Sequence, residues 1–468
     1  MGHLLHRLNQ LVWGIPALTA ILGVGGYLTI RTGVAQLRLL PNALRTFGKQ
    51  MVQNDSKNSD ISPYQAFCTA LGATVGTGNI AGVAGAIAIG GPGAVFWMWI
   101  SAVLGMITKF AEATLAVQYQ IKDESKRILA GPMYIIQNGM KPKWRSMAYV
   151  YAFLGAAASF GVGNSVQINA VISSVESVFN TFGVNLNRLW TVLLGISAAI
   201  LTYFLLLGGA KRIACTAEKL VPFAAFGYIL LCVGVLVARW QLIDDAMRMI
   251  VRGAFSPQAV TGGAVGTLLQ TIRVGTSRGV FTNEAGLGTA GIAHGCVKVE
   301  HPVSQGVLGI VEVFLDTIVI CTLTALVILC SQVPVEFGRD VGAELTVSSF
   351  VSLFGNWISI PLSLITICLA FATVLGWGLY GTRCAQFLFG DQAMKFFVIC
   401  HAIAAFCGAV LETPTIWLWA ETLNGLMLLP NIITIVSKSG TIVSLTRDYE
   451  RHLKLERKNR FCQRTIRL

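Results

Sequence analysis

Eleven apolar runs divide this chain, and each is about as long as a helix that crosses a lipid bilayer. They lie near residues 11–30, 65–90, 93–119, 146–179, 189–208, 213–238, 259–293, 303–331, 355–382, 394–411 and 414–436. A span of this length has to satisfy its own backbone hydrogen bonds in the hydrocarbon core, which a helix does. Only 12% of the residues are charged, whereas about 25% is usual in a soluble protein. We therefore predict an all-α polytopic membrane protein with about 11 transmembrane helices.

Lysine and arginine residues are divided unequally between alternate loops. One side has only Arg7, Arg188, Arg239, Arg248, Arg252 and Arg339, and the other loop cations and the tail fall on the opposite side. Because cytoplasmic loops carry the excess of positive charge, the pattern predicts an outer N-terminus and a cytoplasmic C-terminus in the cell (plasma) membrane. The formal net charge of +13 then reflects topology in a lipid bilayer, and we expect no nucleic-acid partner.

The stretch Gln65–Gly93 is apolar and uncharged, yet glycine interrupts its middle at Gly76, Gly78 and Gly82. Each glycine inside a helix costs about 1 kcal/mol relative to alanine. One interpretation is a helix broken near these glycines, whose freed backbone groups bind an ion or a charged solute. The other is that the glycines let neighbouring helices approach closely. This stretch alone does not decide between them.

A second glycine-interrupted segment, Gly262–Gly295, favours the broken helix. After the first span, five spans follow from residue 65 to 239 and five from 259 to 436, in opposite orientation. Interrupted helices at corresponding places in two inverted halves point to the binding site of a transporter. The sequence therefore predicts a five-plus-five inverted repeat with two broken helices.

The same reasoning divides the chain into five units. They are an N-terminal helix and basic cytoplasmic loop (1–64), the first repeat (65–239), an outer amphipathic segment (240–258), the second repeat (259–436) and a basic cytoplasmic tail (437–468).

Charged residues inside predicted spans are expensive and suggest function. Glu284 has three candidate partners, which are Arg278, Lys109 and Lys219. For Arg278 we favour a buried ion pair that fixes helix packing. Lys109 and Glu112 lie one helical turn apart, which favours a local pair or a lysine that extends toward the interface. We expect His294 at the cytoplasmic interface.

Three uncharged polar or aromatic residues lie in other predicted spans. Gln167 is favoured as a binding residue because an amide both donates and accepts hydrogen bonds. Thr373 and Trp377 lie one helical turn apart. The Thr373 hydroxyl beside a backbone carbonyl would suit a hard cation. The Trp377 indole could form one wall of a small pocket. Ordinary packing explains Thr373 and Trp377 equally well.

Several long motifs resemble the alanine or glycine:cation symporter family. They are GTGNIAGVAGAIAIGGPGAVFWMW (76–99), GMITKFAEATLAVQY (105–119), AGPMYI (130–135), TNEAGLGTAGIAH (282–294) and TVLGWGLYG (373–381). The resemblance covers about residues 10–440, and it implies a leucine-transporter-like fold with one extra N-terminal helix. It also implies sodium-driven uptake of small neutral amino acids, typically alanine or glycine.

The resemblance assigns roles to particular residues. The substrate-binding residues it implies are Thr77, Gly78, Asn79, Gln167, Gly275, Asn283 and Trp377. Thr77 and Gly78 would offer backbone N–H groups to the substrate carboxylate, and Gln167, Gly275 and Trp377 would shape a small pocket. The residues implied for sodium are Gly72, Val75, Ala370 and Thr373. The roles of Asn79, Asn283 and Glu284 within the motifs stay open.

Three other functions compete with sodium symport. A membrane-embedded enzyme would need facing acidic motifs, but the only two adjacent aspartates, Asp244 and Asp245, lie in the outer segment. A channel would carry a pore motif repeated around an oligomer axis. Proton coupling, with Glu112 or Glu284 as the carrier, is the alternative within transporters. The sequence does not specify the amino acid, its stereoisomer or the oligomeric state.

Overall fold

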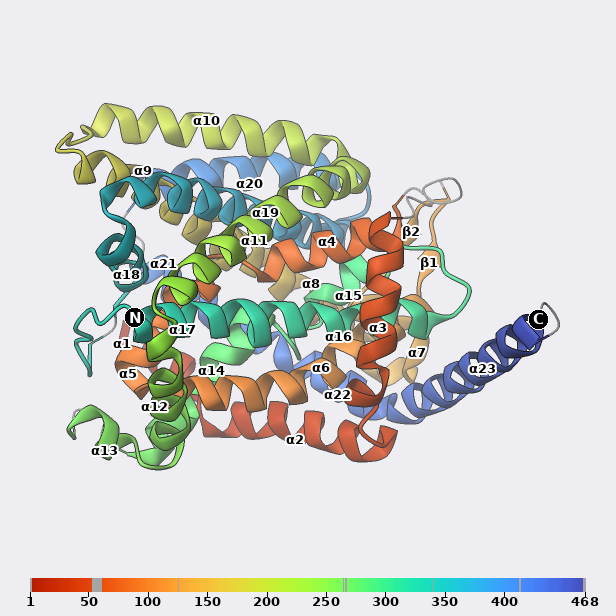
Figure 1. The fold of residues 1–468 in the computed structure, drawn as a ribbon. Coiled ribbons are helices and arrows are strands. Elements are labelled where there is room, and N and C mark those ends of the chain that lie inside the picture. The colour runs from red at the N-terminus through yellow and green to blue at the C-terminus, as the bar shows by residue number, and fades with distance from the viewer. Residues whose placement is uncertain are drawn as a thin grey trace.

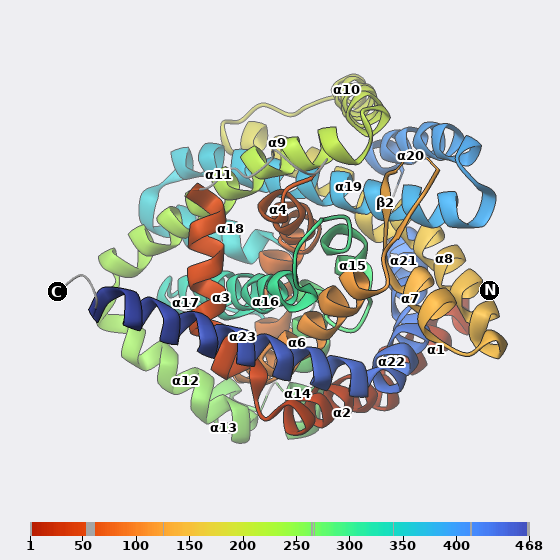
Figure 2. The same ribbon diagram turned by 90° about the vertical axis from the view of Figure 1, so that its right-hand side faces the viewer.

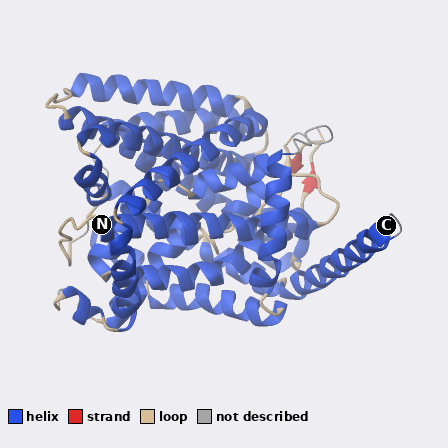
Figure 3. Cartoon of the chain, viewed as in Figure 1, coloured by secondary structure: helices blue, strands red, loops and turns tan. Residues whose placement is uncertain are grey.

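The protein was analysed as a computed structural model, which describes residues 2–52, 61–124, 126–263, 265, 267–339, 341–411 and 414–465. The described part is built from helices and one short hairpin (Figures 1 and 3). The hairpin pairs β1 (Ile121–Lys122) with β2 (Ile128–Leu129) in antiparallel register. The prediction of an all-α membrane protein is confirmed.

The helices before residue 257 are α1 (Gly2–Val12), α2 (Ile15–Thr32), α3 (Ala35–Val52), α4 (Pro63–Thr74), α5 (Ala81–Gly90), α6 (Ala94–Gln118), α7 (Pro132–Gly139), α8 (Arg145–Phe160), α9 (Val166–Thr181), α10 (Arg188–Leu207), α11 (Gly209–Ala238) and α12 (Ile243–Phe255). Those that follow are α13 (Pro257–Thr261), α14 (Leu268–Asn283), α15 (Thr289–His294), α16 (Pro302–Val313), α17 (Thr322–Cys330), α18 (Glu344–Phe354), α19 (Ser359–Phe389), α20 (Gln392–Val410), α21 (Pro414–Leu426), α22 (Leu428–Ser437) and α23 (Ser439–Thr465). Short 3-10 turns are η1 (Thr77–Asn79), η2 (Pro142–Trp144), η4 (Trp240–Leu242) and η6 (Asn356–Ile358), and π-helical segments are η3 (Gly161–Ser165) and η5 (Phe314–Cys321).

Nine helices in the described part are long and apolar enough to cross a membrane, or ten if the bent pair of α4 and α5 counts as one span. The predicted count of 11 is not confirmed. The difference is the run 259–293, which contains the 16-residue α14 and the six-residue α15 on either side of a break. α14 also carries Arg273 and Arg278, so this run does not form one continuous apolar helix.

The long helices lie side by side, and α3 and α12 cross them at opposite ends of the molecule (Figure 1). The end with α3 also carries the hairpin and α23, which Figure 2 views face on. α3 lies within the predicted basic loop. It is helical because Ala35, Leu39 and Ala43 recur every four residues and form a buried stripe. Arg38 of α3 forms an ion pair with Glu450 of α23 at 2.9 Å. The predicted loop and tail also include residues 53–60 and 466–468, which lie outside the described residues.

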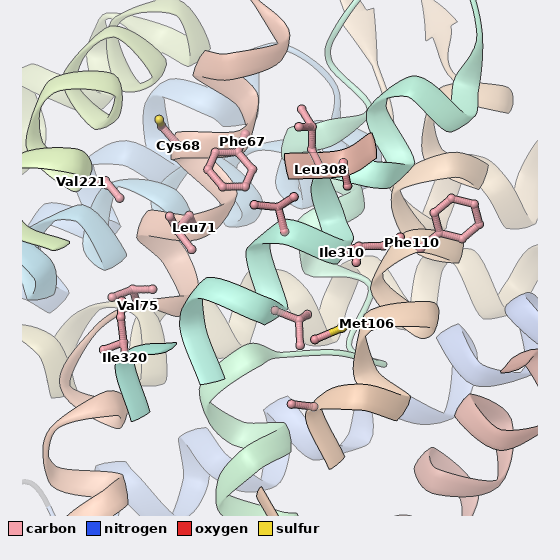
Figure 4. Close-up of a cluster of buried hydrophobic side chains, with 14 of the residues drawn as sticks. Phe67, Cys68, Leu71, Val75, Met106, Phe110, Val221, Leu308, Ile310 and Ile320 are labelled. Atoms are coloured by element: carbon pink, nitrogen blue, oxygen red, sulfur yellow. The ribbon is translucent and has the colours of Figure 1, made fainter. Parts of the chain in front are cut away.

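A cluster of buried apolar side chains holds α4 against α11, α16 and α6 (Figure 4). Phe67 and Leu71 of α4 and Val75, the residue that follows α4, enter this cluster, and all three are close to fully buried. Ile320 of η5 belongs to the same cluster. Because a packed interior tolerates little displacement, these contacts fix the end of α4 relative to η5.

Candidate functional site

The first predicted break lies between α4 and α5. Val75 leaves the helix with an extended backbone, η1 follows, and α5 continues at an angle of 56° to α4. Gly76 faces Thr373, and a Cβ at this glycine would lie 2.7 Å from the Thr373 hydroxyl oxygen. The stretch is therefore a broken helix rather than a continuous one with glycines for packing.

Two side chains from other helices contact this break. The Thr373 hydroxyl donates to the carbonyl oxygen of Gly72 at 2.9 Å and to that of Leu369 at 3.2 Å. The Thr77 hydroxyl donates to the Gln167 side-chain oxygen at 3.2 Å. The Gln167 amide donates in turn to the Val162 carbonyl in η3 at 3.1 Å. The structure thus brings Thr77 to Gln167 and Gly72 to Thr373, as expected from the sequence. Val75 and Ala370, which were grouped with them, are fully buried.

The second break separates α14 from α15. Glu284, Gly286 and Gly288 all have positive φ angles, of 54°, 101° and 81°. Glycine adopts such angles at little cost, whereas Glu284 is strained there unless its surroundings hold it. The interruption predicted within Gly262–Gly295 is confirmed.

Glu112 of α6 accepts hydrogen bonds from the backbone of the second break. One of its carboxylate oxygens accepts the backbone N–H groups of Gly286 at 2.9 Å and Gly288 at 3.1 Å, and the Asn431 amide at 2.7 Å. The side chain is 1% exposed. The described ion pairs do not join Glu112 to Lys109; the carboxylate instead binds the released backbone donors of the break.

Glu284 is held by neutral donors rather than by a cation. Its carboxylate accepts the Trp377 indole N–H at 2.9 Å and the Thr289 hydroxyl at 2.7 Å. The described contacts include no ion pair from Glu284 to any of its three predicted partners. Trp377 is fully buried, so its indole links α19 to the second break.

A chain of hydrogen bonds joins the two breaks through η5. The Asn79 amide accepts from the Gly76 N–H at 3.0 Å and donates to the Asp316 carboxylate at 2.7 Å. The Thr317 hydroxyl donates to the other Asp316 oxygen at 2.8 Å, and the Asn283 amide donates to Thr317 at 3.1 Å. The side chains of Asp316 and Thr317 are fully buried.

Sequence reasoning missed Asp316 and a second acid, Glu312. The available signal was two acids four residues apart in an otherwise apolar run, which places both on one helix face inside the membrane. Glu312 pairs with Lys109 at 3.1 Å and contacts His294 at 2.9 Å. Lys109 is fully buried and does not extend to the interface, and His294 is fully buried rather than interfacial.

Gly275 packs against α6 and is not part of the hydrogen-bonded groups at the two breaks. A Cβ at Gly275 would lie 2.2 Å from the carbonyl oxygen of Ala94 and 2.8 Å from the Trp97 side chain. The glycine therefore permits close packing of α14 on α6. Gly78, in contrast, faces α14 near the second break, where a Cβ would lie 3.4 Å from Thr282.

Two of the protein's cavities lie at opposite ends of the helices, and none of their described lining residues belongs to the first break. The one near the hairpin has a volume of about 1050 Å³. The other has a volume of about 520 Å³ and lies near α1 and the start of α14, lined by Arg273, Arg278 and Glu421. Arg273 is exposed, and Arg278 is half-buried rather than buried as expected.

Two broken helices that buried hydrogen bonds link inside a helical bundle are the features of a secondary transporter with a leucine-transporter-like fold. Among solved structures, MhsT in complex with L-phenylalanine superimposes with a TM-score of 0.57, at 14% identity, over 78% of this chain and 88% of that chain. The profile of the sodium:alanine symporter family matches residues 1–463, and the chain belongs to this family.

Two relatives extend over nearly the whole chain. The sodium/alanine symporter AgcS of Methanococcus maripaludis is 40% identical, over 97% of this chain and 99% of its own length. The probable sodium/glutamine symporter GlnT of Bacillus subtilis is 36% identical, over 97% of this chain and 92% of its own length. The chain is thus a multi-pass amino-acid symporter and not an enzyme.

Proposed function

We propose that this protein couples sodium entry to uptake of a small neutral amino acid, alanine or glycine, by alternating access. The observation that carries the proposal is the first break. Within the described residues, the backbone N–H groups of Thr77 and Gly78 have no hydrogen-bond acceptor. The name of the relative AgcS supports alanine and sodium for that protein.

The substrate carboxylate would bind the N–H groups of Thr77 and Gly78, because the start of a half-helix carries the positive end of its dipole. Gln167 would orient Thr77 through their hydrogen bond. Three side chains would support the site indirectly because each is already hydrogen-bonded within the protein. They are those of Asn79, Asn283 and Trp377.

Sodium would lie between α4 and α19. Carbonyl oxygens of Gly72, Val75 and Ala370 together with the Thr373 hydroxyl form an oxygen-only set, which suits a hard cation. The direct bond from Thr373 to Gly72 supports this placement because it brings two of these oxygens to 2.9 Å.

Coupling would run through the bonds that connect Asn79, Asp316, Thr317 and Asn283. A change at one break alters the other through this chain, and sodium and substrate then strengthen each other's binding equally. Inward sodium movement also gains about 2.3 kcal/mol per charge for each 100 mV of membrane potential.

We place the end that carries α3, the hairpin and α23 in the cytoplasm, and the N-terminus outside. The unequal distribution of lysine and arginine supports this orientation. We likewise retain the division into repeats 65–239 and 259–436, with 240–258 between them, as a proposal. The division is supported by the two breaks, one near the start of each repeat.

The test is uptake of radiolabelled L-alanine and glycine into proteoliposomes, with sodium, potassium and proton gradients imposed separately. Accumulation that requires an inward sodium gradient is the expected result. No uptake of either amino acid with any gradient would refute the proposed substrate class.

Proton coupling is the second candidate, and buried acids favour it. Glu112, Glu284 and Asp316 are each at most 3% exposed, and Lys109, a buried lysine nearby, pairs with Glu312. Among the described ion pairs, none neutralises these three carboxylates. Uptake driven by outside acid without sodium would select this candidate.

Thr373→Ala is expected to raise the sodium concentration for half-maximal uptake by about 10-fold, because one oxygen ligand is lost. The preference between alanine and glycine is expected to change little. Thr373→Ser keeps the hydroxyl and is the matched control. An unchanged sodium response in Thr373→Ala would show that the ion binds elsewhere.

A further inference from the structure

The cavity near the hairpin has a lining rich in cations. It lies among β1, β2, the end of α19 and the starts of α11 and α20, on the end of the molecule seen in Figure 2. Its charged lining residues are Lys122, Lys126, Arg127, Lys211, Lys298, Arg383, Lys395 and Asp391. Among the described lining residues, seven cations therefore share the cavity with one carboxylate.

That carboxylate is already bound. Asp391 accepts from the Gln386 amide at 2.6 Å and from the Arg127 guanidinium at 2.5 Å. These two donors hold the pKa of Asp391 below its usual range. Arg127 also pairs with Asp123, so two acids neutralise this one arginine. Within the described residues, the lysines of the lining form no ion pair.

Arg383 lines the cavity and carries a buried donor that has no partner among the described residues. The residue is 6% exposed, and one terminal nitrogen donates to the Gln386 oxygen at 2.7 Å. The Nε atom is buried and has no acceptor among the described residues. An unmet buried donor on a charged group is costly, and a guanidinium matches the oxygens of a phosphate. The general excess of positive charge in cytoplasmic loops does not explain an arginine buried within a long helix.

We propose that this cavity binds a small multivalent anion of the phosphate class. The volume of about 1050 Å³ accommodates a compound as large as a polyphosphate or a phospholipid headgroup. Its phosphates would accept hydrogen bonds from Arg383 and from lysines on four separate segments of the chain. Binding would relieve the mutual repulsion of these cations and join α11, α19 and α20. A sodium ion is excluded here by the same charges.

Binding is tested on the purified full chain in detergent by titration calorimetry with potassium tripolyphosphate. Saturable binding is expected, with weakening as salt screens the charges. The double variant Lys211→Gln/Lys395→Gln removes two exposed cations and is expected to lower affinity about 10-fold or more. Arg383→Gln is expected to do the same, and the exposed pair keeps the test valid if that variant fails to fold. Lys141→Gln/Arg145→Gln removes two exposed cations outside the cavity and is the matched control.

A second measurement identifies the source of the phosphate. Native mass spectrometry of the chain purified from phosphatidylglycerol vesicles counts retained lipid. Retained phosphatidylglycerol that is lost in Lys211→Gln/Lys395→Gln, without tripolyphosphate binding, assigns a lipid headgroup. Saturable tripolyphosphate binding assigns a free phosphate compound. Absence of both, or an equal loss in the control variant, overturns the proposal. Neither measurement depends on transport, so the outcome is separate from that of the uptake test.

Discussion

Glu112→Leu is expected to destabilise the protein by about 3 kcal/mol or more, because three buried donors lose their acceptor and each costs about 1–3 kcal/mol. Those donors are the N–H groups of Gly286 and Gly288 and the Asn431 amide. Leucine fills a similar volume, so the loss is mainly one of hydrogen bonding. The measurement is the melting temperature of the purified protein in detergent, read together with the yield of folded protein.

Two variants separate this role from a simple loss of charge. Glu112→Gln keeps a carbonyl oxygen at the break and is expected to melt between the wild type and Glu112→Leu. Glu124→Leu changes an exposed glutamate in the hairpin turn and is expected to shift stability by no more than about 0.5 kcal/mol. A Glu112→Leu protein as stable as the wild type would show that water or other groups satisfy the break.

The two breaks were predictable because their cause is local. Glycine inside an apolar run weakens the helix wherever the run folds, and the pattern in 65–93 and 262–295 carries this information in adjacent residues. The family resemblance assigned both Thr77 and Gln167 to substrate binding, and the structure places them in contact. Gly275 was also assigned through the family resemblance, but it permits packing against Ala94, and nothing in the surrounding sequence distinguishes the two roles.

The partners of the buried charges were not predictable, because they depend on how distant helices meet. Glu112 and Gly286 are 174 positions apart, and nothing near either residue indicates the other. Local spacing favoured Lys109 for Glu112, yet Lys109 is matched by Glu312, 203 positions later, once α6 packs on α16. Every residue except proline has a backbone N–H, so the sequence does not show which of these groups is free to donate. A carboxylate that binds the backbone of a break therefore cannot be distinguished by sequence from other acids within membrane spans. Such acids are recognisable as important from sequence, but their roles require the fold.

Asp316→Asn is expected to reduce uptake by about 100-fold, because two hydrogen bonds to a charged acceptor contribute about 1.5–3 kcal/mol each and every 1.4 kcal/mol is tenfold. The bonds are those from Asn79 and Thr317, and they link the first break to the second. The decisive readout is the coupling of the two ligands. Alanine affinity is measured at a series of sodium concentrations, and in Asp316→Asn it is expected to respond much less to sodium.

Thr317→Val tests whether the link itself matters rather than the charge. It removes the hydroxyl between Asp316 and Asn283 and leaves the bond from Asn79 to Asp316 in place. We expect reduced coupling with smaller loss of uptake than in Asp316→Asn, since only the second break is released. Equal sodium dependence of alanine binding in the wild type and both variants would mean that the breaks communicate by another route. A weakening of coupling in both, at unchanged melting temperature, would establish η5 as the element that connects the two breaks, because a purely structural role would lower stability without altering how one ligand affects the other.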